Sequence, residues 1–251
     1  SVYLGMRFVF VGAGNPFQIT NVDLVNDDVT LSWTPLAGKF YAVDASADLR
    51  GWETRVTEYP DGGATGESIS YTDRGVPQDM AARYYRVRQV PAPALFSTDF
   101  EDGANAWTAT TDAGDTHWEL GTPNAGGLTT ASSGTQAWGT NLDGTYTPDS
   151  VARLRSPVID VTGVKNPELS FNYFIDSILD EEGGQVRFFN EAGDDLGRTE
   201  IFSGTTETWT PFVLKFPEAA LDQKVIIEFA FLTDRDDSVG AGWYIDDVVI
   251  D

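Results

Sequence analysis

The chain has 251 residues, of which 41% are hydrophobic and 12% aromatic, and it contains no Cys, which excludes disulfides, thiolate metal sites and a cysteine nucleophile. Its formal net charge is −23, and the acidity is concentrated in residues 95–251, which hold 28 acidic and 8 basic residues. Such a field disfavours nucleic acid and anionic membranes and attracts divalent cations, and no apolar run approaches the ~20 residues that span a bilayer.

The first predicted element is a strand over residues 1–11 with one wholly apolar face. A Gly-rich joint over residues 12–16 follows and separates this strand from the rest of the chain. The strand either folds back within its own domain or pairs with another copy of the chain. In the second case it acts as an assembly strand that builds a fibre. Its apolar face comprises Val2, Leu4, Met6, Phe8 and Phe10.

Residues 17–90 predict six strands, at 17–25, 28–34, 39–46, 52–59, 67–73 and 82–90. The segments Val29–Trp33, Tyr41–Ser46 and Tyr84–Arg88 resemble a fibronectin type III-like module, with Trp33 as the implied core residue. That family has seven strands, so the final strand is missing and an unpaired edge is expected near residues 84–88. Two prolines in the linker at residues 91–94 end the module.

The second domain, residues 95–251, reads as short strands separated by Gly, Asp and Asn turns. Its strongest predicted strands lie at 152–160, 168–174, 185–189, 208–214 and 225–231. No long segment with helical periodicity interrupts either domain. We therefore predict an all-β chain of two tandem β-sandwiches with an extra N-terminal strand.

Carboxylates occur in the first and last strands of this domain, where strands disfavour them. Asp246 and Asp247 lie within the β-rich run 242–250, and a buried unpaired carboxylate is costly. Asp99 and Glu101 offer further hard oxygen ligands near the domain start, where a first strand is expected beside the last. Ca²⁺ takes six to eight such oxygens, so these four residues predict a calcium site. The alternative is an acidic strand end at the surface without a metal.

Several motifs of this domain resemble the jelly-roll modules of secreted bacterial proteins. They are the opening 99–107, the middle segments 118–123 and 137–142, and the closing run 242–248. Those modules are similar to MAM domains, cleaved-adhesin domains and calcium-containing carbohydrate-binding modules. The resemblance implies a two-sheet sandwich, an extracellular or cell-surface location, and a structural Ca²⁺ held by Glu101 and Asp246 or Asp247.

Aromatic residues give a second candidate site, for a glycan. Trp118, Trp138 and Tyr146 would offer stacking surfaces if they were exposed, with Asn and Asp side chains as partners for sugar hydroxyls. Most aromatic residues of a small sandwich lie in its core, however. We expect at most one or two of the domain's aromatic residues to be exposed.

The sequence gives little support for catalysis. The one histidine, His117, is not paired by any motif with an activated serine. The acidic segments 176–182 and 234–237 lack the spacing of an EF-hand, so we expect solvated turns, with a second Ca²⁺ as the alternative. We therefore predict a non-catalytic, calcium-stabilised structural or adhesive protein that polymerises through its first strand. The alternatives are a carbohydrate-binding accessory module and, less favoured, a hydrolase.

Overall fold

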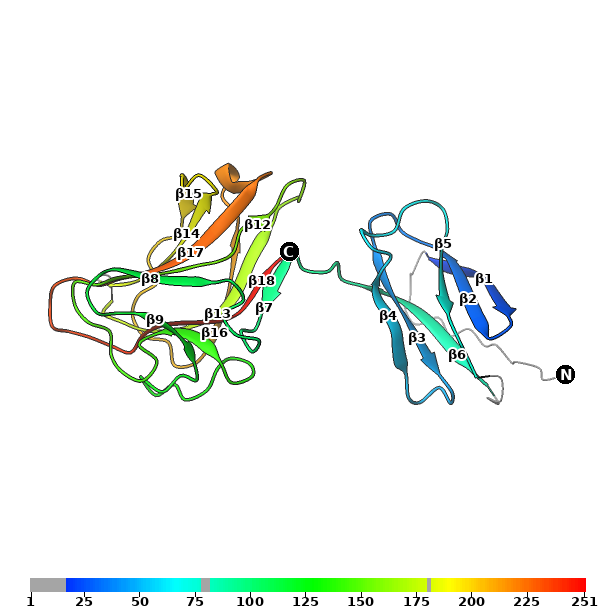
Figure 1. Cartoon of the computed structure of the whole chain (residues 1–251), viewed down its shortest axis with the longest axis horizontal. Helices are drawn as coiled ribbons and strands as arrows, with labels where there is room; N and C mark the ends of the chain where they lie inside the picture. Colours follow the sequence, from blue (N-terminus) through cyan, green and yellow to red (C-terminus); the bar gives the residue numbers. More distant parts are fainter. Residues whose placement is uncertain (1–16, 78–81, 180–181) are drawn as a thin grey trace. The chain divides into compact units, whose positions relative to one another are not determined.

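The computed structural model describes residues 17–77, 82–179 and 182–251. The chain divides into two compact units, Ser1–Pro93 (unit 1) and Ala94–Asp251 (unit 2), each built almost wholly of antiparallel strands (Figure 1). The only helix among the described residues is the short 3₁₀ turn η1, Glu218–Ala220, so none of these residues forms a helix long and apolar enough to cross a membrane.

Unit 1 consists of two three-stranded sheets. One has the order β1-β2-β5 and the other β4-β3-β6. The strands are β1 (Gln18–Val25), β2 (Asp28–Thr34), β3 (Phe40–Ser46), β4 (Glu53–Tyr59), β5 (Ile69–Asp73) and β6 (Tyr84–Val90). All six lie where the sequence predicted them, with starting points shifted by at most two residues. Among the described residues β6 pairs only with β3, so its other edge is open.

The core of unit 1 lies between these two sheets because the apolar residues alternate along the strands. Leu31 and Trp33 of β2 pack with Tyr41 and Val43 of β3, and Tyr85 of β6 closes the cluster. Trp33 is fully buried, as its place in the sequence pattern predicted. The assembly strand, with Val2, Leu4, Met6, Phe8 and Phe10, lies outside the described residues.

Unit 2 is a sandwich of two six-stranded sheets. In one, β16-β13-β18-β10-β9 are neighbours and β7 also pairs with β18. In the other, β15-β14-β17-β11-β8 are neighbours and β12 also pairs with β17. The strands are β7 (Phe96–Thr98), β8 (Thr108–Ala113), β9 (Trp118–Gly121), β10 (Ala137–Thr140), β11 (Val151–Arg155), β12 (Ile159–Asp160), β13 (Glu168–Asp176), β14 (Gly183–Asn190), β15 (Asp195–Arg198), β16 (Thr210–Lys215), β17 (Lys224–Leu232) and β18 (Gly242–Ile250).

The two sheets of unit 2 enclose one core. Phe171 of β13 and Trp243 of β18 come from one sheet, and both meet Phe229 of β17 from the other, at ring-centroid distances of 5.0 and 5.5 Å. One predicted strand differs from the structure: residues 152–160 form the separate strands β11 and β12. Pro157, which has no N–H to donate, lies in the break between them.

Candidate calcium site

Asp246 and Asp247 lie at the point where β18 changes its neighbour in the sheet. On one edge β18 pairs with β13. On the other edge β10 pairs with it up to Ile245, and β7 pairs with it from Val248 onward. The two carboxylates therefore occupy a gap between two partner strands, which we call the junction. This gap results from the order of the strands in the sheet.

A bulge turns both carboxylates of the junction toward the same loop. Asn172 of β13 lies opposite Asp246, whereas Ser170 lies opposite Val249, so β18 has one extra residue here. Asp247 accommodates the bulge with a φ of 51°, in the left-handed region that Asp tolerates better than most residues do. Side chains of successive residues, which alternate in a regular strand, here both contact Ser133.

Asp246 is a fully buried carboxylate, 0% exposed. Its Oδ2 accepts hydrogen bonds from the amides of Ser132 and Ser133, at 2.9 and 3.1 Å, and its Oδ1 accepts one from the amide of Asp247 at 2.8 Å. Burial raises the pKa of Asp246 to about 6, and these amide hydrogen bonds offset only part of that effect. Asp246 therefore does not lie at a surface strand end.

Glu101, near the beginning of unit 2, contacts the same loop, residues 132–136. Its Oε1 accepts hydrogen bonds from the amides of Thr135 and Gln136, at 2.8 and 2.7 Å, and its Oε2 accepts one from the Thr135 hydroxyl at 3.0 Å. These bonds lower the pKa of Glu101. Gly134 has a φ of +55°, and a Cβ there would collide with the Glu101 carboxyl group, so the loop over residues 132–136 closes around Glu101 only with glycine at this position.

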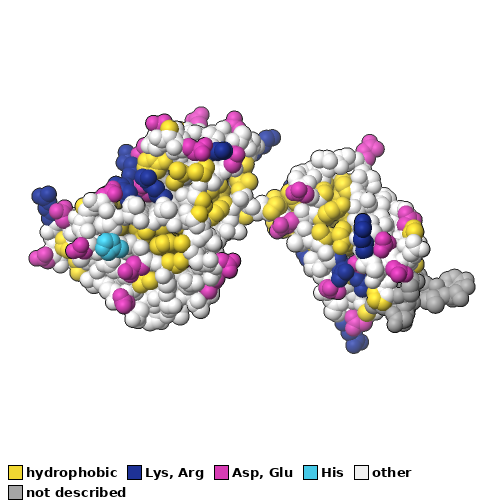
Figure 2. Space-filling model, viewed as in Figure 1, with side chains coloured by type: hydrophobic (Ala, Val, Ile, Leu, Met, Phe, Trp, Pro, Cys, Tyr) yellow, Lys and Arg dark blue, Asp and Glu magenta, His cyan; other side chains and the backbone are white. Residues whose placement is uncertain are grey.

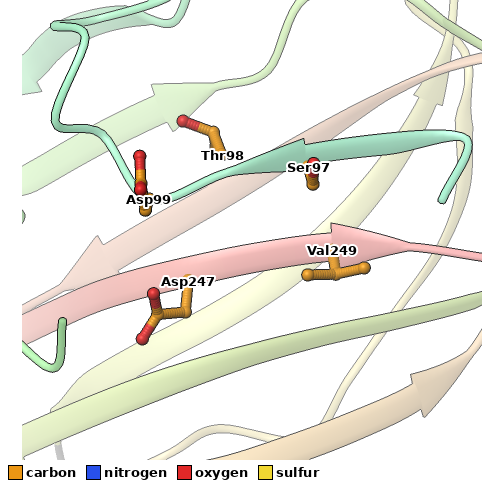
Figure 3. A pocket seen from close by; sticks show the side chains of 5 residues that line it. All are labelled: Ser97, Thr98, Asp99, Asp247 and Val249. Atoms are coloured by element: carbon orange, nitrogen blue, oxygen red, sulfur yellow. The ribbon is translucent and has the colours of Figure 1, made fainter. Parts of the chain in front are cut away.

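Asp99 and Asp247 both line a shallow pocket of about 250 Å³ beside the junction (Figure 3). Ser97, Thr98 and Val249 complete its lining. Asp247 also accepts hydrogen bonds from the Ser133 hydroxyl, at 2.6 Å, and from Asn172 Nδ2, at 3.0 Å. Of the four predicted ligands, Glu101 and Asp246 contact loop 132–136, Asp99 lines the pocket, and Asp247 does both.

The donor atoms of the junction suit a hard cation. Carboxylates of Glu101, Asp246 and Asp247 are accompanied by the hydroxyls of Ser133 and Thr135 and by the carbonyl groups of the loop, and Ca²⁺ accepts all three kinds of oxygen. Within the part of the chain that the structure describes, however, no three Asp, Glu, His or Cys side chains gather at metal-binding spacing. A calcium ion here would therefore need hydroxyl, carbonyl or water ligands beside the carboxylates.

The aromatic residues predicted to bind a glycan lie in the core instead. Trp118, Trp138 and Tyr146 are 4%, 6% and 1% exposed. Trp118 packs on Trp243, with ring centroids 5.8 Å apart, and Tyr146 packs on Phe231 at 5.1 Å. All three side chains are buried and are therefore not available for stacking on a sugar. Sequence motifs mark these positions as aromatic but do not distinguish a core ring from a surface ring.

His117 is an exposed residue just before β9. Its Nδ1 shares a hydrogen bond of 2.8 Å with the Thr111 hydroxyl, and its amide donates to Asn141 Oδ1 at 3.0 Å. Both contacts tie neighbouring segments together, which is a structural role.

A cluster of charged residues that the sequence analysis did not single out lies on the sheet β15-β14-β17-β11-β8. Glu228 of β17, 0% exposed, accepts hydrogen bonds from Arg153 Nη1 and Arg155 Nε, both at 2.7 Å, and from Arg187 Nη1 at 3.2 Å. Arg155 and Arg187 lie directly opposite Glu228 on the two neighbouring strands. We call these four residues the arginine face.

The arginine face lies on the side of the sheet away from the core, because Leu154 and Phe229, next to its members in the sequence, point into the core. Figure 2 shows basic side chains gathered on one part of unit 2, among acidic ones. The guanidinium groups of Arg155 and Arg187 also cover the ring of Phe189, at 5.3 and 4.8 Å from its centroid. The sequence signal was Glu228, the one charged residue inside the apolar run 225–231.

Comparison with known proteins gives a partial match. No protein-family model matches the chain. It is 29% identical over 255 residues to bacillopeptidase F of Bacillus subtilis (strain 168), an alignment that covers 96% of this chain and 17% of that protein. The chain thus spans about a sixth of the length of this relative.

Among solved structures, the chain is similar to a carbohydrate-binding module of the β-sandwich superfamily, with 16% identity, a TM-score of 0.43, and 93% of this chain and 96% of that one covered. It is also similar to the K3 cleaved-adhesin domain of Lys-gingipain from Porphyromonas gingivalis w83, with 19% identity, a TM-score of 0.40, and 63% and 99% covered. Likenesses of this size do not establish a shared ligand.

Proposed function

We propose that this chain is a non-catalytic binding module of an extracellular protein and that unit 2 is stabilised by Ca²⁺ at the junction. The observation that carries the proposal is the convergence of Glu101 and the buried Asp246 on loop 132–136, at the gap between two partner strands of β18. A divalent cation there would offset the cost of burying Asp246. It would also tie the beginning of unit 2 to its last strand.

Thermal unfolding of the intact chain in calcium and in excess chelator tests this proposal. A ligand that binds only the folded state stabilises it by about 2.7 kcal/mol at one hundred times its Kd, so calcium should raise the melting temperature of unit 2. Asp246→Asn should abolish most of that rise. Asp143→Asn, an exposed acidic residue in a turn, is the matched control and should leave it unchanged. Equal melting of the wild type in calcium and in chelator would refute a stabilising ion.

The match to a small part of bacillopeptidase F supports an accessory role within a longer protein. We also propose an extracellular or cell-surface location, which the resemblance of the motifs to jelly-roll modules of secreted proteins supports. Partners in this setting are cell-surface or glycan ligands, or other copies of the chain.

Glycan binding at the arginine face is a second candidate function. The buried Glu228 fixes three guanidinium groups in place, so their remaining N–H donors are preorganised for sugar hydroxyls. Asp112 and Asp195 also form ion pairs with Arg153 and Arg187, so together with Glu228 three carboxylates balance the three guanidinium groups, which suits a neutral glycan. Affinity electrophoresis in gels that contain neutral polysaccharides should show retardation that Arg155→Ala removes and Lys165→Ala, an exposed control, does not. If no neutral polysaccharide retards the wild type, this candidate fails.

Self-association through the assembly strand is a further part of the proposal. The edge of β6 that no described strand covers would offer N–H and C=O groups to a donated strand. The alternating apolar residues of 2–10 supply a matching strand in sequence terms. A head-to-tail contact of this kind builds a fibre unless its rotation closes a ring.

A further inference from the structure

Two acidic loops that are far apart in the sequence meet at one end of unit 2. The loop after β17 is held to residues 146–150: the Thr233 amide donates to Ser150 O at 3.0 Å, and the Tyr146 amide donates to Gly240 O at 3.2 Å. The loop before β14 reaches the same residues, since the Tyr146 hydroxyl donates to Glu182 Oε2. The segment 146–150 therefore brings Glu182 close to the acidic turn 234–237.

Glu182 is a buried carboxylate without a charge partner. Its side chain is 1% exposed, and although Oε2 accepts the Tyr146 hydrogen bond, Oε1 is buried and has no hydrogen-bond partner of ordinary geometry among the described residues. No arginine or lysine of these residues forms an ion pair with it. An unpaired buried carboxylate oxygen costs several kcal/mol, which folded proteins usually avoid by pairing or by metal coordination.

The neighbouring carboxylates further disfavour the charged form of Glu182. Burial raises the pKa of Glu182, and the carboxylates of Asp234 and Asp236 raise it further, although the Tyr146 hydroxyl and the nearby Asp234 amide act in the opposite direction. Arg235, the base within this turn, is directed elsewhere, with Nε 3.6 Å from Asp149 Oδ1. Three carboxylates thus repel one another at a place where no described cation compensates them.

Oxygen atoms for a cation are available around this position. Asp234 and Asp236 each use Oδ1 to accept an amide hydrogen bond, from Asp236 and Ser238 at 3.0 and 2.7 Å, which leaves the Oδ2 atoms for another ligand. Glu182 supplies Oε1 from the interior side. The remaining positions of a hard divalent ion would go to carbonyl oxygens and water, because no three acidic side chains already lie at metal-binding spacing among the described residues.

We propose that this end of unit 2 holds a second divalent-cation site, separate from the junction, in which Glu182 is the buried ligand and Asp234 and Asp236 are the ligands on the solvent side. A hard ion such as Ca²⁺ satisfies the unpaired oxygen of Glu182 and links the loop before β14 to the loop after β17. The site uses different residues from the junction, so it does not depend on whether the junction binds an ion.

Calorimetric titration of the chelator-stripped intact chain with CaCl₂ tests the proposal. The wild type should bind two ions per chain. Glu182→Gln retains the shape of the side chain and a partner for Tyr146 but removes the charge, so it should bind one. Asp246→Asn, at the junction, is the matched control and should lose the other ion. If Glu182→Gln binds as many ions as the wild type, with unchanged affinity, the second site does not exist, whatever Asp246→Asn does.

A second measurement guards against misfolding of the buried variant. Asp234→Asn/Asp236→Asn changes only residues of the outer turn and should weaken binding of one ion at least tenfold. In chelator, Glu182→Gln should melt at a higher temperature than the wild type, because a buried amide costs less than an unpaired carboxylate. Addition of calcium should raise the melting temperature of Glu182→Gln by less than it raises that of the wild type. The proposal would be overturned if the double variant bound calcium with unchanged affinity, or if calcium raised the melting temperatures of Glu182→Gln and the wild type equally.

Discussion

Five acidic side chains are buried among the described residues, and they fall into two groups. Asp44, Asp73 and Glu228 are each held by two or three arginines. Asp246 and Glu182 form no ion pair in the described part of the chain. Since the fold provides arginines for three of its buried carboxylates, the two without them are the residues at which a metal ion would have the largest stabilising effect.

Asp73 permits a pH prediction in unit 1. Burial acts to raise its pKa, but hydrogen bonds from Arg83 and Tyr85 outweigh burial and lower the pKa below its ordinary value of 3.8. A group whose pKa is depressed on folding stabilises the protein above its unfolded pKa and loses that effect as pH falls through the folded value. The stability of unit 1 should therefore fall below about pH 4.

Asp73→Asn should reduce the free energy of unfolding by on the order of 3 kcal/mol at pH 7, because two arginines lose their buried partner. It should also make the loss of stability of unit 1 below about pH 4 less steep. Asp61→Asn, an exposed control in the same unit, should change neither. Denaturant unfolding at a series of pH values gives the answer, and an equally steep loss of stability in acid for Asp73→Asn and the wild type would contradict the assignment.

Gly134→Ala tests the loop that closes the junction. The new Cβ would collide with the Glu101 carboxyl group, and the backbone has a positive φ, so unit 2 should lose about 1–3 kcal/mol. Gly144→Ala is the matched control, since nothing lies within 4 Å of its Cβ position, and it should stay within about 0.5 kcal/mol of the wild type. Scanning calorimetry measures both. Equal stability of the two variants would mean that loop 132–136 does not hold Glu101.

At the scale of elements, strands were predictable where one face alternates regularly. The runs that became β2 and β3 have apolar residues at every second position, and their bounds were confirmed to within one residue. The bulge at Asp247 was not predictable, because it depends on which strands flank β18. The meeting of Glu182 with the turn 234–237 depends on packing between segments some fifty residues apart, which no local pattern records.

The same limit explains what the sequence missed at the candidate site. Glu101 and Asp246 could be singled out from the sequence as candidate ligands, because acidic residues at strand ends require compensation. The loop that joins them, residues 132–136, consists of Ser, Thr, Gly and Gln, which carry no signal of their own. The arginine face is spread over three strands, so its members become one cluster only in the folded sheet.

Deletion of residues 1–11 tests the assembly strand. If this segment pairs with the open edge of β6 in a neighbouring copy, the deletion should convert large species into monomers or destabilise unit 1, and unit 2 should stay folded. Sedimentation velocity across a concentration series measures the change. Replacing Tyr3 and Val9, on the opposite face, with Ser is the control and should preserve assembly. A wild-type chain that is monomeric at high concentration would exclude the fibre.

At the scale of the whole molecule, the charge distribution predicts what the chain does not bind. Residues 95–251 hold 28 acidic against 8 basic residues, and the three arginines of the arginine face are paired with Glu228, Asp112 and Asp195. The intact chain should therefore bind neither duplex DNA nor heparin at about 0.15 M salt. Retention on a heparin column that weakens steeply with salt would contradict this expectation.

An ion at the junction would join the beginning of unit 2 to its last strand. The most direct measurement is a crystal structure grown in CaCl₂, with anomalous scattering used to identify calcium. We expect an ion about 2.3–2.6 Å from carboxylate oxygens of Glu101 and Asp246, and its loss from crystals soaked in chelator. Crystals grown in calcium that show only the amides of loop 132–136 on these two carboxylates, with no ion density, would contradict the claim.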